Sequence, residues 1–336
     1  MIKVPTDATP PSLDGLSVCL YSDGEGLGDG IIKLHFLYAL REALPSAHIT
    51  WLISVSSIYF THLSELANPV IDEIVVHPPG KIRWKNLLDA RPLHNRRMDV
   101  VADTQMSFRR NLWVWRIRHG RSVFLWPWQR QGSLLDRLIN LGQRVAKRPL
   151  QFKPLPISNV WTQKAKERLP QEGGYLGLVP GAGFDYKRWP LECFVRLARQ
   201  VVQEGLTPVI FLGPSEARTE MGAELRKAVP EAVFPLQEGD SPLLTIALAQ
   251  RLTAAVANDS GGGHLIAAAG IPMVSLIRSN SVRRKFMPAT SRVIALTPED
   301  FGGSAMGDIP FEPVEAALKQ LLCPSCAESG HKDGPI

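Results

Sequence analysis

The stretch NDSGGGHLIAAAG, residues 258–270, places an acid, a hydroxyl, three glycines and a histidine directly after the apolar run LTAAVA. Asp259 or Ser260 can cap a helix that begins at the glycines, and the first N–H groups of a helix have no acceptor within it. Because Gly261 and its neighbours leave those N–H groups uncovered, a diphosphate can lie against them, and His264 can donate to the same anion. The pattern indicates an anion site; the alternative is a structural histidine in a capped helix.

A second loop, VPGAGFDYKRWP at residues 179–190, places cations at another helix start. Its proline and glycines favour a turn, and Lys187 and Arg188 stand just before the helix expected from Pro190. Free backbone N–H groups together with a lysine would hold a phosphate. The alternative is a pair of solvent-exposed cations, and this loop alone does not decide between the two.

A third loop, SDGEGLGDGIIK at residues 22–33, follows an apolar run and opens a helix. Asp29 stands near the helix start, where the helix dipole stabilises an ionised carboxylate by roughly 0.3–1 kcal/mol. Its side chain is either a helix N-cap or a general base. The loop lacks a strict Gly-x-Gly-x-x-Gly and a Gly-Lys-Ser/Thr, and no acid ends the second strand, so a dinucleotide site and a P-loop are disfavoured. The Gly-x-Ser-x-Gly elbow of serine hydrolases needs glycine where this sequence has Asn258, so a serine hydrolase is disfavoured as well.

The elements that must position these loops alternate between short β-rich apolar runs and helical patterns, which is typical of parallel α/β sheets. In the first half we expect strands at residues 16–22, 48–54, 71–77, 98–104 and 121–126, and a helix over 30–44. An extended linker is expected at 153–158. After it we expect strands from 175 and at 207–213, 232–237, 253–259, 272–277 and 291–297, and helices at 190–205, 215–228, 243–252 and 311–322. Parallel sheets bind ligands beyond the carboxyl ends of their strands, where all three loops fall.

The length of 336 residues predicts two domains. We expect an N-terminal domain at 1–155, a C-terminal domain at 156–322 and a flexible tail at 323–336. The composition, 45% hydrophobic and 21% charged, is that of a globular protein. No apolar run reaches the ~18 to 20 residues of a membrane span, and the first residues lack the apolar core of a secretion signal. Four scattered cysteines, with Cys323 and Cys326 only half a metal site, agree with a cytoplasmic protein.

Positive charge is concentrated between residues 105 and 150, where ten Arg or Lys accompany one acid, Asp136. Four of the eight tryptophans lie in the same segment. This mixture suits an anionic, partly apolar partner such as phospholipid headgroups or a phosphorylated glycolipid, although composition alone also fits nucleic acid. The alternative is a solvated cationic face with tryptophans in the core.

Three segments resemble, in their order and spacing, motifs of the heptosyltransferase-type family 9 glycosyltransferases: GLGDGIIKLHFLYALREALPSAHITWLI, PGAGFDYKRWPLECFVRLA and NDSGGGHLIAAAGIPMVSLI. The resemblance covers residues 18–321. It implies an α/β fold with GT-B architecture, in which two Rossmann-like doubly wound parallel-sheet domains face a cleft. The first domain of that architecture binds mainly the acceptor, and the second binds mainly the nucleotide sugar.

The resemblance also assigns roles by position. Asp29 would be the base that takes a proton from the acceptor hydroxyl, Lys187 would hold the donor diphosphate and Glu216 would bind the nucleotide ribose. The family's Asp-Thr-Gly-x-x-His, with serine in place of threonine, assigns four further residues to the donor: Asp259, Ser260, Gly261 and His264. The basic segment would face an anionic glycolipid acceptor or the inner face of the inner membrane, through Arg109, Arg110, Arg116, Arg118 and Arg121. No nucleic-acid partner is expected.

The reaction implied is an inverting, metal-independent transfer of a heptose-like sugar from an ADP-sugar to a lipopolysaccharide core or related glycolipid, with no cofactor. The sequence contains no Asp-x-Asp. After VSLI the chain continues RSNSVRRKFMP, where the family has Phe-Gly and a Thr/Ser-x-Pro loop that touches the donor, so the sugar stays open. The alternatives are a glycosyltransferase for another acceptor, a sugar-nucleotide epimerase and a catalytically silent nucleotide-sugar-binding protein.

Overall fold

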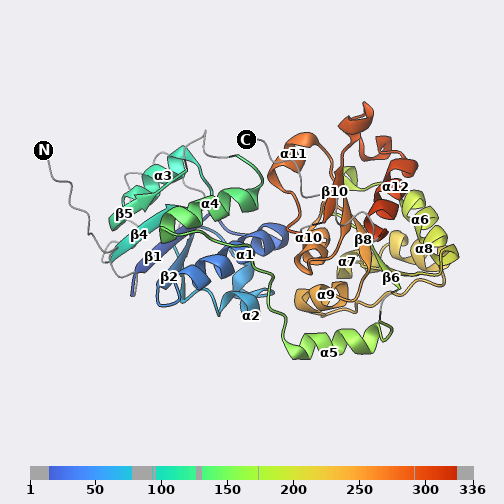
Figure 1. The fold of residues 1–336 in the computed structure, drawn as a ribbon, viewed down its shortest axis with the longest axis horizontal. Coiled ribbons are helices and arrows are strands. Elements are labelled where there is room, and N and C mark those ends of the chain that lie inside the picture. The colour runs from blue at the N-terminus through green and yellow to red at the C-terminus, as the bar shows by residue number, and fades with distance from the viewer. Residues whose placement is uncertain are drawn as a thin grey trace, which may run out of the picture.

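The computed structural model describes residues 15–77, 93, 96–125, 131–172, 174–290 and 292–323, excepting the side chains of Arg109, Pro214 and Ser215. The chain forms two α/β lobes, each built on a five-stranded sheet (Figure 1). Every pairing between neighbouring strands in both sheets is parallel, which confirms the expected pair of doubly wound domains. Three residues of the basic segment at 105–150 lie outside the described residues: Trp126, Trp128 and Arg130. Cys326 and the rest of the expected tail from 324 onward lie outside them as well.

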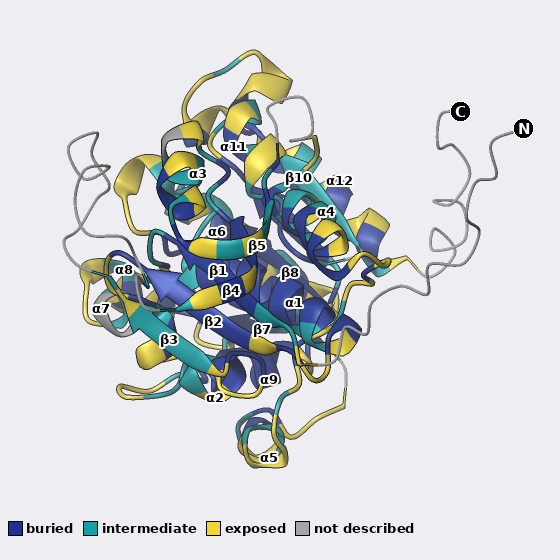
Figure 2. Cartoon of the chain, turned by 90° about the vertical axis from the view of Figure 1, so that its left-hand side faces the viewer, coloured by how far each residue is buried: buried dark blue, intermediate teal, exposed yellow. Residues whose placement is uncertain are grey.

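The first sheet has the strand order β3-β2-β1-β4-β5. Its strands are β1 (Ser17–Ser22), β2 (His48–Ile53), β3 (Glu73–Val76), β4 (Arg97–Asp103) and β5 (Arg118–Val123). Figure 2 shows the central strands buried and β5 partly exposed. The expected strand at 121–126 begins three residues too late, because the polar sequence RHGR already pairs with β4 at this solvent-exposed edge.

The second sheet has the order β10-β9-β8-β6-β7. Its strands are β6 (Tyr175–Val179), β7 (Thr207–Ile210), β8 (Ala254–Asn258), β9 (Met273–Leu276) and β10 (Val293–Leu296). The strand expected at 232–237 was wrong: only Val233 pairs there, in a single bridge to Val209 at the outer side of β7. Pro235, two residues later, has no N–H with which to extend the ladder.

Helices cover both sheets. In the first lobe they are α1 (Leu27–Ala43), α2 (Ser64–Ala67), α3 (Phe108–Trp115) and α4 (Leu134–Ala146), with a short 3-10 turn, η1 (Ile58–Phe60). The second lobe has α5 (Asn159–Arg168), α6 (Leu191–Gln203), α7 (Pro214–Ala217), α8 (Glu220–Ala228), α9 (Pro242–Ala249), α10 (Gly261–Ala268), α11 (Asn280–Lys285) and α12 (Phe311–Leu322), with 3-10 turns η4 (Asp185–Lys187), η5 (Pro298–Phe301) and η6 (Met306–Asp308). The helix expected at 215–228 is interrupted between α7 and α8. None of the described helices is long and apolar enough to span a membrane.

One apolar core cluster spans both lobes, because α1 of the first lobe packs against α10 of the second (Figure 1). Helix α1 is buried along almost its whole length, so it shows little difference between faces. The cluster that contains Ile31 and Leu34 of α1 also contains four residues of the second lobe: Leu243, Ile246, Leu265 and Ala268. Helix α5, which follows the expected linker at 153–158, also contacts the first lobe, since Trp161 Nε1 donates to the carboxylate oxygens of Glu65 at 3.1 and 3.0 Å.

Each sheet has a point where successive strands are added on opposite sides, between β1 and β4 in the first and between β6 and β8 in the second. Ligands of open parallel sheets bind at such points, beyond the carboxyl ends of the strands. The loops that follow β1, β6 and β8 are the three loops singled out in the sequence. The fold therefore places them at the carboxyl edges of the two sheets.

Candidate functional site

Asp29 lies in the first turn of α1, as its third residue. The N-cap of α1 is Gly26, so Asp29 does not cap the helix. Asp29 is partly exposed, and its carboxylate takes part in no hydrogen bond or ion pair with the described residues. A carboxylate without partners among the described residues is available to take a proton from a ligand, as a general base must.

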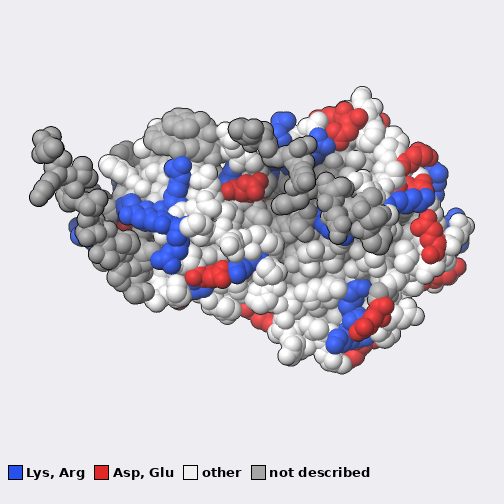
Figure 3. Space-filling view, in the orientation of Figure 1, with Lys and Arg blue, Asp and Glu red and all other residues white. Residues whose placement is uncertain are grey.

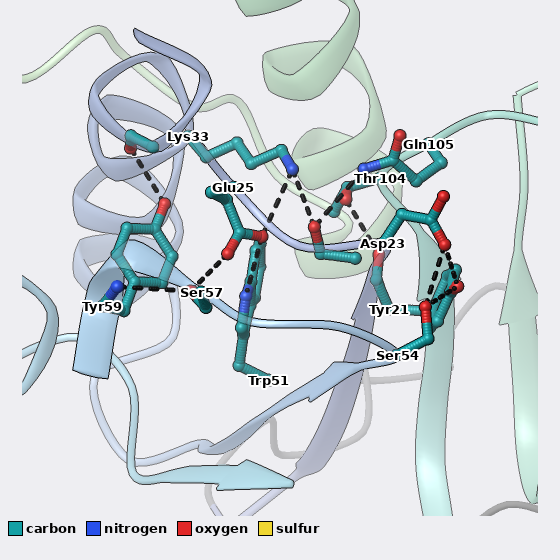
Figure 4. Close-up of polar contacts among 12 residues, drawn as sticks. Tyr21, Asp23, Glu25, Lys33, Trp51, Ser54, Ser57, Tyr59, Thr104 and Gln105 are labelled. Atoms are coloured by element: carbon teal, nitrogen blue, oxygen red, sulfur yellow. Dashed lines mark hydrogen bonds and ion pairs between the residues drawn. The ribbon is translucent and has the colours of Figure 1, made fainter. Parts of the chain in front are cut away.

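The other two acids of this loop, Asp23 and Glu25, are held by neighbouring side chains (Figure 4). Asp23 accepts hydrogen bonds from Tyr21 at 2.7 Å and Ser54 at 2.9 Å and is paired with Arg110. Burial raises the pKa of Asp23, but the hydrogen bonds from Tyr21, Arg110 and Ser54 outweigh that effect and hold the pKa below its usual value. Asp29 is thus the acid of the three that the protein leaves for a ligand.

Glu25 belongs to a buried polar network beneath the start of α1 (Figure 4). Its carboxylate accepts from Trp51 Nε1 at 3.1 Å, from Ser57 Oγ and from Lys33 Nζ at 3.3 Å. Lys33, one helical turn after Asp29, also donates to Ser22 at 2.7 Å. A buried ion pair of this kind is costly unless its partners are satisfied, and here they fix the loop against α1.

On the second lobe, Asp259 lies between two potential cations. Its carboxylate is 4.0 Å from Lys187 Nζ and 3.8 Å from His264 Nε2. Both separations are longer than a normal hydrogen bond, so an anionic ligand can compete for the lysine and the imidazole. The structure thus brings together Lys187, Asp259 and His264, although Lys187 and His264 are 77 positions apart in the sequence.

His264 is 7% exposed in the first turn of α10. Burial lowers the pKa of His264 below its usual value, and the charge of Lys187 lowers it further. The negative charges of Asp259 and Asp29 raise the pKa, but they do not outweigh burial. The imidazole is therefore neutral at neutral pH and offers one N–H as a donor. Ser260 caps the same helix, because its Oγ accepts from the N–H of Gly263 at 3.2 Å.

A cavity of about 580 Å³ opens beside this cluster, over the carboxyl ends of β6 and β7. Ser260, Gly261 and Gly262 form its wall on the α10 side, and Glu216 lies opposite with Gly181 and Gly213. Glu216 accepts a hydrogen bond from the N–H of Gly213 at 2.9 Å. Lys187, Asp259 and His264 lie just beyond its Ser260 wall rather than lining it. The cavity has the size of a small-ligand site.

The starts of α1 and α10 face each other across the junction of the lobes. A β-carbon placed on Gly28 would lie 2.8 Å from His264 Cδ2, and one on Gly261 would lie 3.2 Å from Leu27. Asp29, the residue after Gly28, is therefore close to His264, and its charge influences the imidazole. The candidate base from the first lobe and the candidate donor site from the second lobe thus share one location.

The basic segment is largely on the first lobe, where Lys and Arg side chains gather on the surface (Figure 3). Arg116 follows α3, and Arg118, at the start of β5, is exposed. Arg110 is paired with Asp23, and Arg121 donates to the carbonyls of Arg144 and Val145 at 2.7 and 2.8 Å at the end of α4. Both therefore have partners within the protein. The side chain of Arg109 lies outside the described part of the chain.

Sequence reasoning missed Asn258, a buried residue that joins two of the loops. Its side chain donates to the carbonyl of Pro180 at 2.7 Å and accepts from the N–H of Trp189 at 3.1 Å. It thereby fixes both ends of the loop that carries Lys187 to the end of β8. A polar residue directly after the largely apolar run LTAAVA was the available signal. Among the described residues no group of three or more His, Cys, Asp or Glu is arranged as a metal site.

The comparison with curated proteins finds two relatives of similar identity. The chain is 35% identical over 107 residues to lipooligosaccharide heptosyltransferase 2 of Haemophilus influenzae, which covers 30% of each protein. It is 34% identical over 118 residues to lipopolysaccharide heptosyltransferase 2 of Escherichia coli, which covers 34% of this chain and 33% of that protein. The matched stretch thus spans only about a third of each relative.

Solved structures share the fold over almost the whole chain. The glycosyl transferase family 9 protein of Veillonella parvula superposes with a TM-score of 0.71 at 22% identity, covering 92% of this chain and 98% of that one. The ADP-heptose heptosyltransferase II of Escherichia coli superposes with a TM-score of 0.63 at 22% identity, covering 91% and 98%. The family model for glycosyltransferase family 9 (heptosyltransferase) matches residues 129–300, just over half of the sequence. With the expected motifs in place on the expected fold, this chain belongs to glycosyltransferase family 9.

Proposed function

We propose that the chain is an inverting, metal-independent glycosyltransferase that moves a heptose-like sugar from an ADP-sugar to a lipopolysaccharide core or a related glycolipid. Family membership supports the reaction class. The names of the two curated relatives support the sugar and the acceptor, and the name of one solved relative supports ADP as the nucleotide.

The donor would lie across the second lobe with its nucleoside in the cavity over β6 and β7. There the Glu216 carboxylate can accept from ribose hydroxyls while it accepts from the N–H of Gly213. The diphosphate would then lie at the start of α10, where unpaired N–H groups and the helix dipole favour an anion. Lys187 and the imidazole of His264 flank that position.

In the transfer step the acceptor oxygen attacks the anomeric carbon as the bond from that carbon to the diphosphate oxygen breaks. The nucleoside diphosphate leaves with the bonding electron pair, and the developing charge is stabilised by Lys187, His264 and the N–H groups of α10. The Asp29 carboxylate takes the proton of the acceptor hydroxyl. Full turnover in excess chelator is the result that the metal-independent part of the proposal requires.

The observation that carries this proposal is the contact between the starts of α1 and α10. A β-carbon on Gly28 would come within 2.8 Å of the His264 ring, so the carboxylate of Asp29 and the donor cluster meet at one place. A nucleotide-binding protein without catalytic activity would need the cavity, Lys187 and His264. It would not need a carboxylate from the other lobe beside them.

Replacing Asp29 by asparagine tests the proposal. Turnover should fall by roughly 10² to 10⁴, because the base is lost, while the Kd for ADP measured by calorimetry changes less than about twofold. Glu231→Gln, an exposed acid away from the site, should behave as the wild type. Unchanged turnover in Asp29→Asn would contradict the assignment of the base, and binding of ADP-sugar without any transfer would favour a silent binding protein.

The acceptor would approach from the first lobe at the cytoplasmic face of the inner membrane, in peripheral contact with it. Three apolar side chains support such a contact, because they lie on one face of α3 with 63, 36 and 60% exposure: Phe108, Leu112 and Trp115. Trp113 takes no part, since it is 2% exposed in the core. Arginines in the same segment would meet anionic headgroups or the acidic groups of the glycolipid.

A further inference from the structure

Phe184 and Tyr186 form a pair of stacked aromatic rings at the surface. Their ring centres are 5.4 Å apart and their planes differ by 16°. The two residues are 58% and 62% exposed, although aromatic side chains of this size normally contribute to packing. A contiguous exposed apolar patch that is rimmed by polar groups can mark a ligand-binding site.

The loop that carries the two rings is fixed at both sides, so the rings stand on a rigid support. The Arg188 guanidinium donates to the carbonyl of Ala182 at 2.9 Å and pairs with Asp185 at 2.7 Å. Trp189 is buried, and its indole N–H donates to the carbonyl of Ile309 at 2.8 Å. Because Lys187 follows directly after Tyr186 in η4, the rings lie beside the proposed diphosphate position.

Arg278 approaches Tyr186 from the other side of β8. Strand β8 lies between β6 and β9 in the sheet, and Tyr186 follows β6 whereas Arg278 follows β9. The guanidinium carbon of Arg278 is 5.9 Å from the centre of the Tyr186 ring. The two loops therefore meet over the carboxyl end of β8, where Asp259 begins the donor cluster. Arg278 is exposed and forms no ion pair with a described residue.

The nucleotide does not account for these three side chains. The cavity assigned to the nucleoside lies over the carboxyl ends of β6 and β7, and none of Phe184, Tyr186 and Arg278 is among the residues that line it. An exposed cation beside two exposed rings matches a ligand that has apolar ring faces and negative charge. A saccharide that carries phosphate or carboxylate groups has both properties.

We propose that Phe184, Tyr186 and Arg278 form a platform for the saccharide of the acceptor. The ring faces contact the C–H face of a pyranose, and Arg278 binds an anionic group on that sugar or on its neighbour. The platform rests on the proposed glycosyl transfer and adds to it a contact from the second lobe. The acceptor is then held from both sides of the transfer site, with its reacting hydroxyl at Asp29.

A binding experiment without turnover tests the platform on the full chain. The probe is a deacylated, phosphorylated core oligosaccharide of bacterial lipopolysaccharide, titrated by calorimetry into wild type, Phe184→Ala, Tyr186→Ala and Arg278→Gln, with ADP and an ADP-sugar titrated in parallel. Each variant should raise the Kd for the oligosaccharide about 3- to 10-fold and leave the Kd for ADP within about twofold. Tyr186→Phe, which keeps the ring, should bind as the wild type, as should Val160→Ala, an exposed apolar residue on α5.

Arg278→Gln should weaken binding of the phosphorylated probe but not of the same oligosaccharide after phosphatase treatment. Oligosaccharide affinity that is equal in all variants, or absent in the wild type, overturns the platform. If these variants bind ADP-sugar more weakly and the oligosaccharide as the wild type does, the acceptor assignment is overturned and the rings contact the donor sugar instead. A wild type that binds the oligosaccharide but transfers no sugar contradicts the proposed transferase and leaves this test valid.

Discussion

Gly28 of the first lobe lies directly against the imidazole of His264 in the second. A β-carbon at Gly28 would be 2.8 Å from Cδ2 and 3.5 Å from Nε2 of that ring. The absence of a side chain at this position allows the first turns of α1 and α10 to touch, with Asp29 one residue away. The distance between the candidate base and the donor cluster is therefore set by one glycine.

Gly28→Ala should separate the two helix starts. Because both the backbone of α1 and the His264 ring are packed, the added methyl group forces a shift, and overpacking of this kind costs typically 1–3 kcal/mol. We expect kcat/KM to fall at least about tenfold with a modest decrease in Tm. Gly26→Ala is the matched control, since a β-carbon there meets nothing within 4 Å. Equal activity of the two variants would show that the contact is not needed.

Lys187→Ala should weaken binding of the diphosphate. Hydrogen bonds to charged groups contribute roughly 1.5–3 kcal/mol, so the Kd for ADP should rise about 10- to 100-fold. The Kd for adenosine, which has no phosphate, should stay within about twofold. Lys166→Ala, an exposed lysine of α5, serves as the control. If adenosine binding falls as much as ADP binding, Lys187 acts on the nucleoside or on the fold of its loop.

Gly181→Ala should reproduce the effect of removing Glu216. A β-carbon on Gly181 would come within 2.1 Å of both carboxylate oxygens of Glu216, so the side chain must leave its place in the cavity. We expect both ADP and adenosine to bind at least about fivefold more weakly in Gly181→Ala and in Glu216→Ala. Gly183→Ala in the same loop is the control, because a β-carbon there meets nothing within 4 Å. Normal binding of adenosine in Gly181→Ala would remove Glu216 from the nucleoside site.

Asp103, at the end of β4, should make stability depend on pH. Burial raises its pKa to about 6, although hydrogen bonds from the N–H groups of Ser107 and Gln105 lower it. A carboxyl whose pKa is higher in the folded state than in the unfolded state stabilises the fold at low pH, and this contribution is lost as pH rises through the folded pKa. Between pH 4 and 7 the free energy of unfolding of the wild type should therefore fall relative to Asp103→Asn, by about 2 kcal/mol.

Urea unfolding of the wild type and Asp103→Asn at pH 4, 5, 6 and 7 measures this difference, because the contributions of all other groups cancel between the two proteins at each pH. A difference that stays constant across the range, or that grows in favour of the wild type as pH rises, would contradict the raised pKa of Asp103.

Much of the fold follows from local sequence patterns. The runs around Val18, Ile49 and Val256 are apolar on both faces because their strands are buried on both faces, and this made their positions predictable. The polar edge strand β5 was misplaced, since its pairing depends on β4 and not on its own residues. Helices α3, α4 and α5 were not predicted. Serine caps α4, and that signal was present in the sequence at Ser133.

The sequence predicted candidate site residues where they lie in a loop that directly follows a strand. Asp29, Lys187 and His264 were found because each follows an apolar run and begins a helix or turn. The contacts that fix them are not local. Glu25 and Lys33 meet Trp51 and Ser57 from the neighbouring strand and its loop, and only the folded chain brings these together. The Tyr186 and Arg278 contact likewise joins residues from two loops that flank a third strand.

The apolar core shared by α1, α9 and α10 has a consequence for how the protein holds together. One of the apolar clusters belongs to both halves, because Leu265 and Ala268 complete packing that begins at Ile31. If the chain were cut at the linker, residues 153–158, apolar surface would be exposed on both fragments. We therefore expect the two halves to unfold as one cooperative unit. Any movement of the lobes that admits ligands must keep the contacts among α1, α9 and α10 intact.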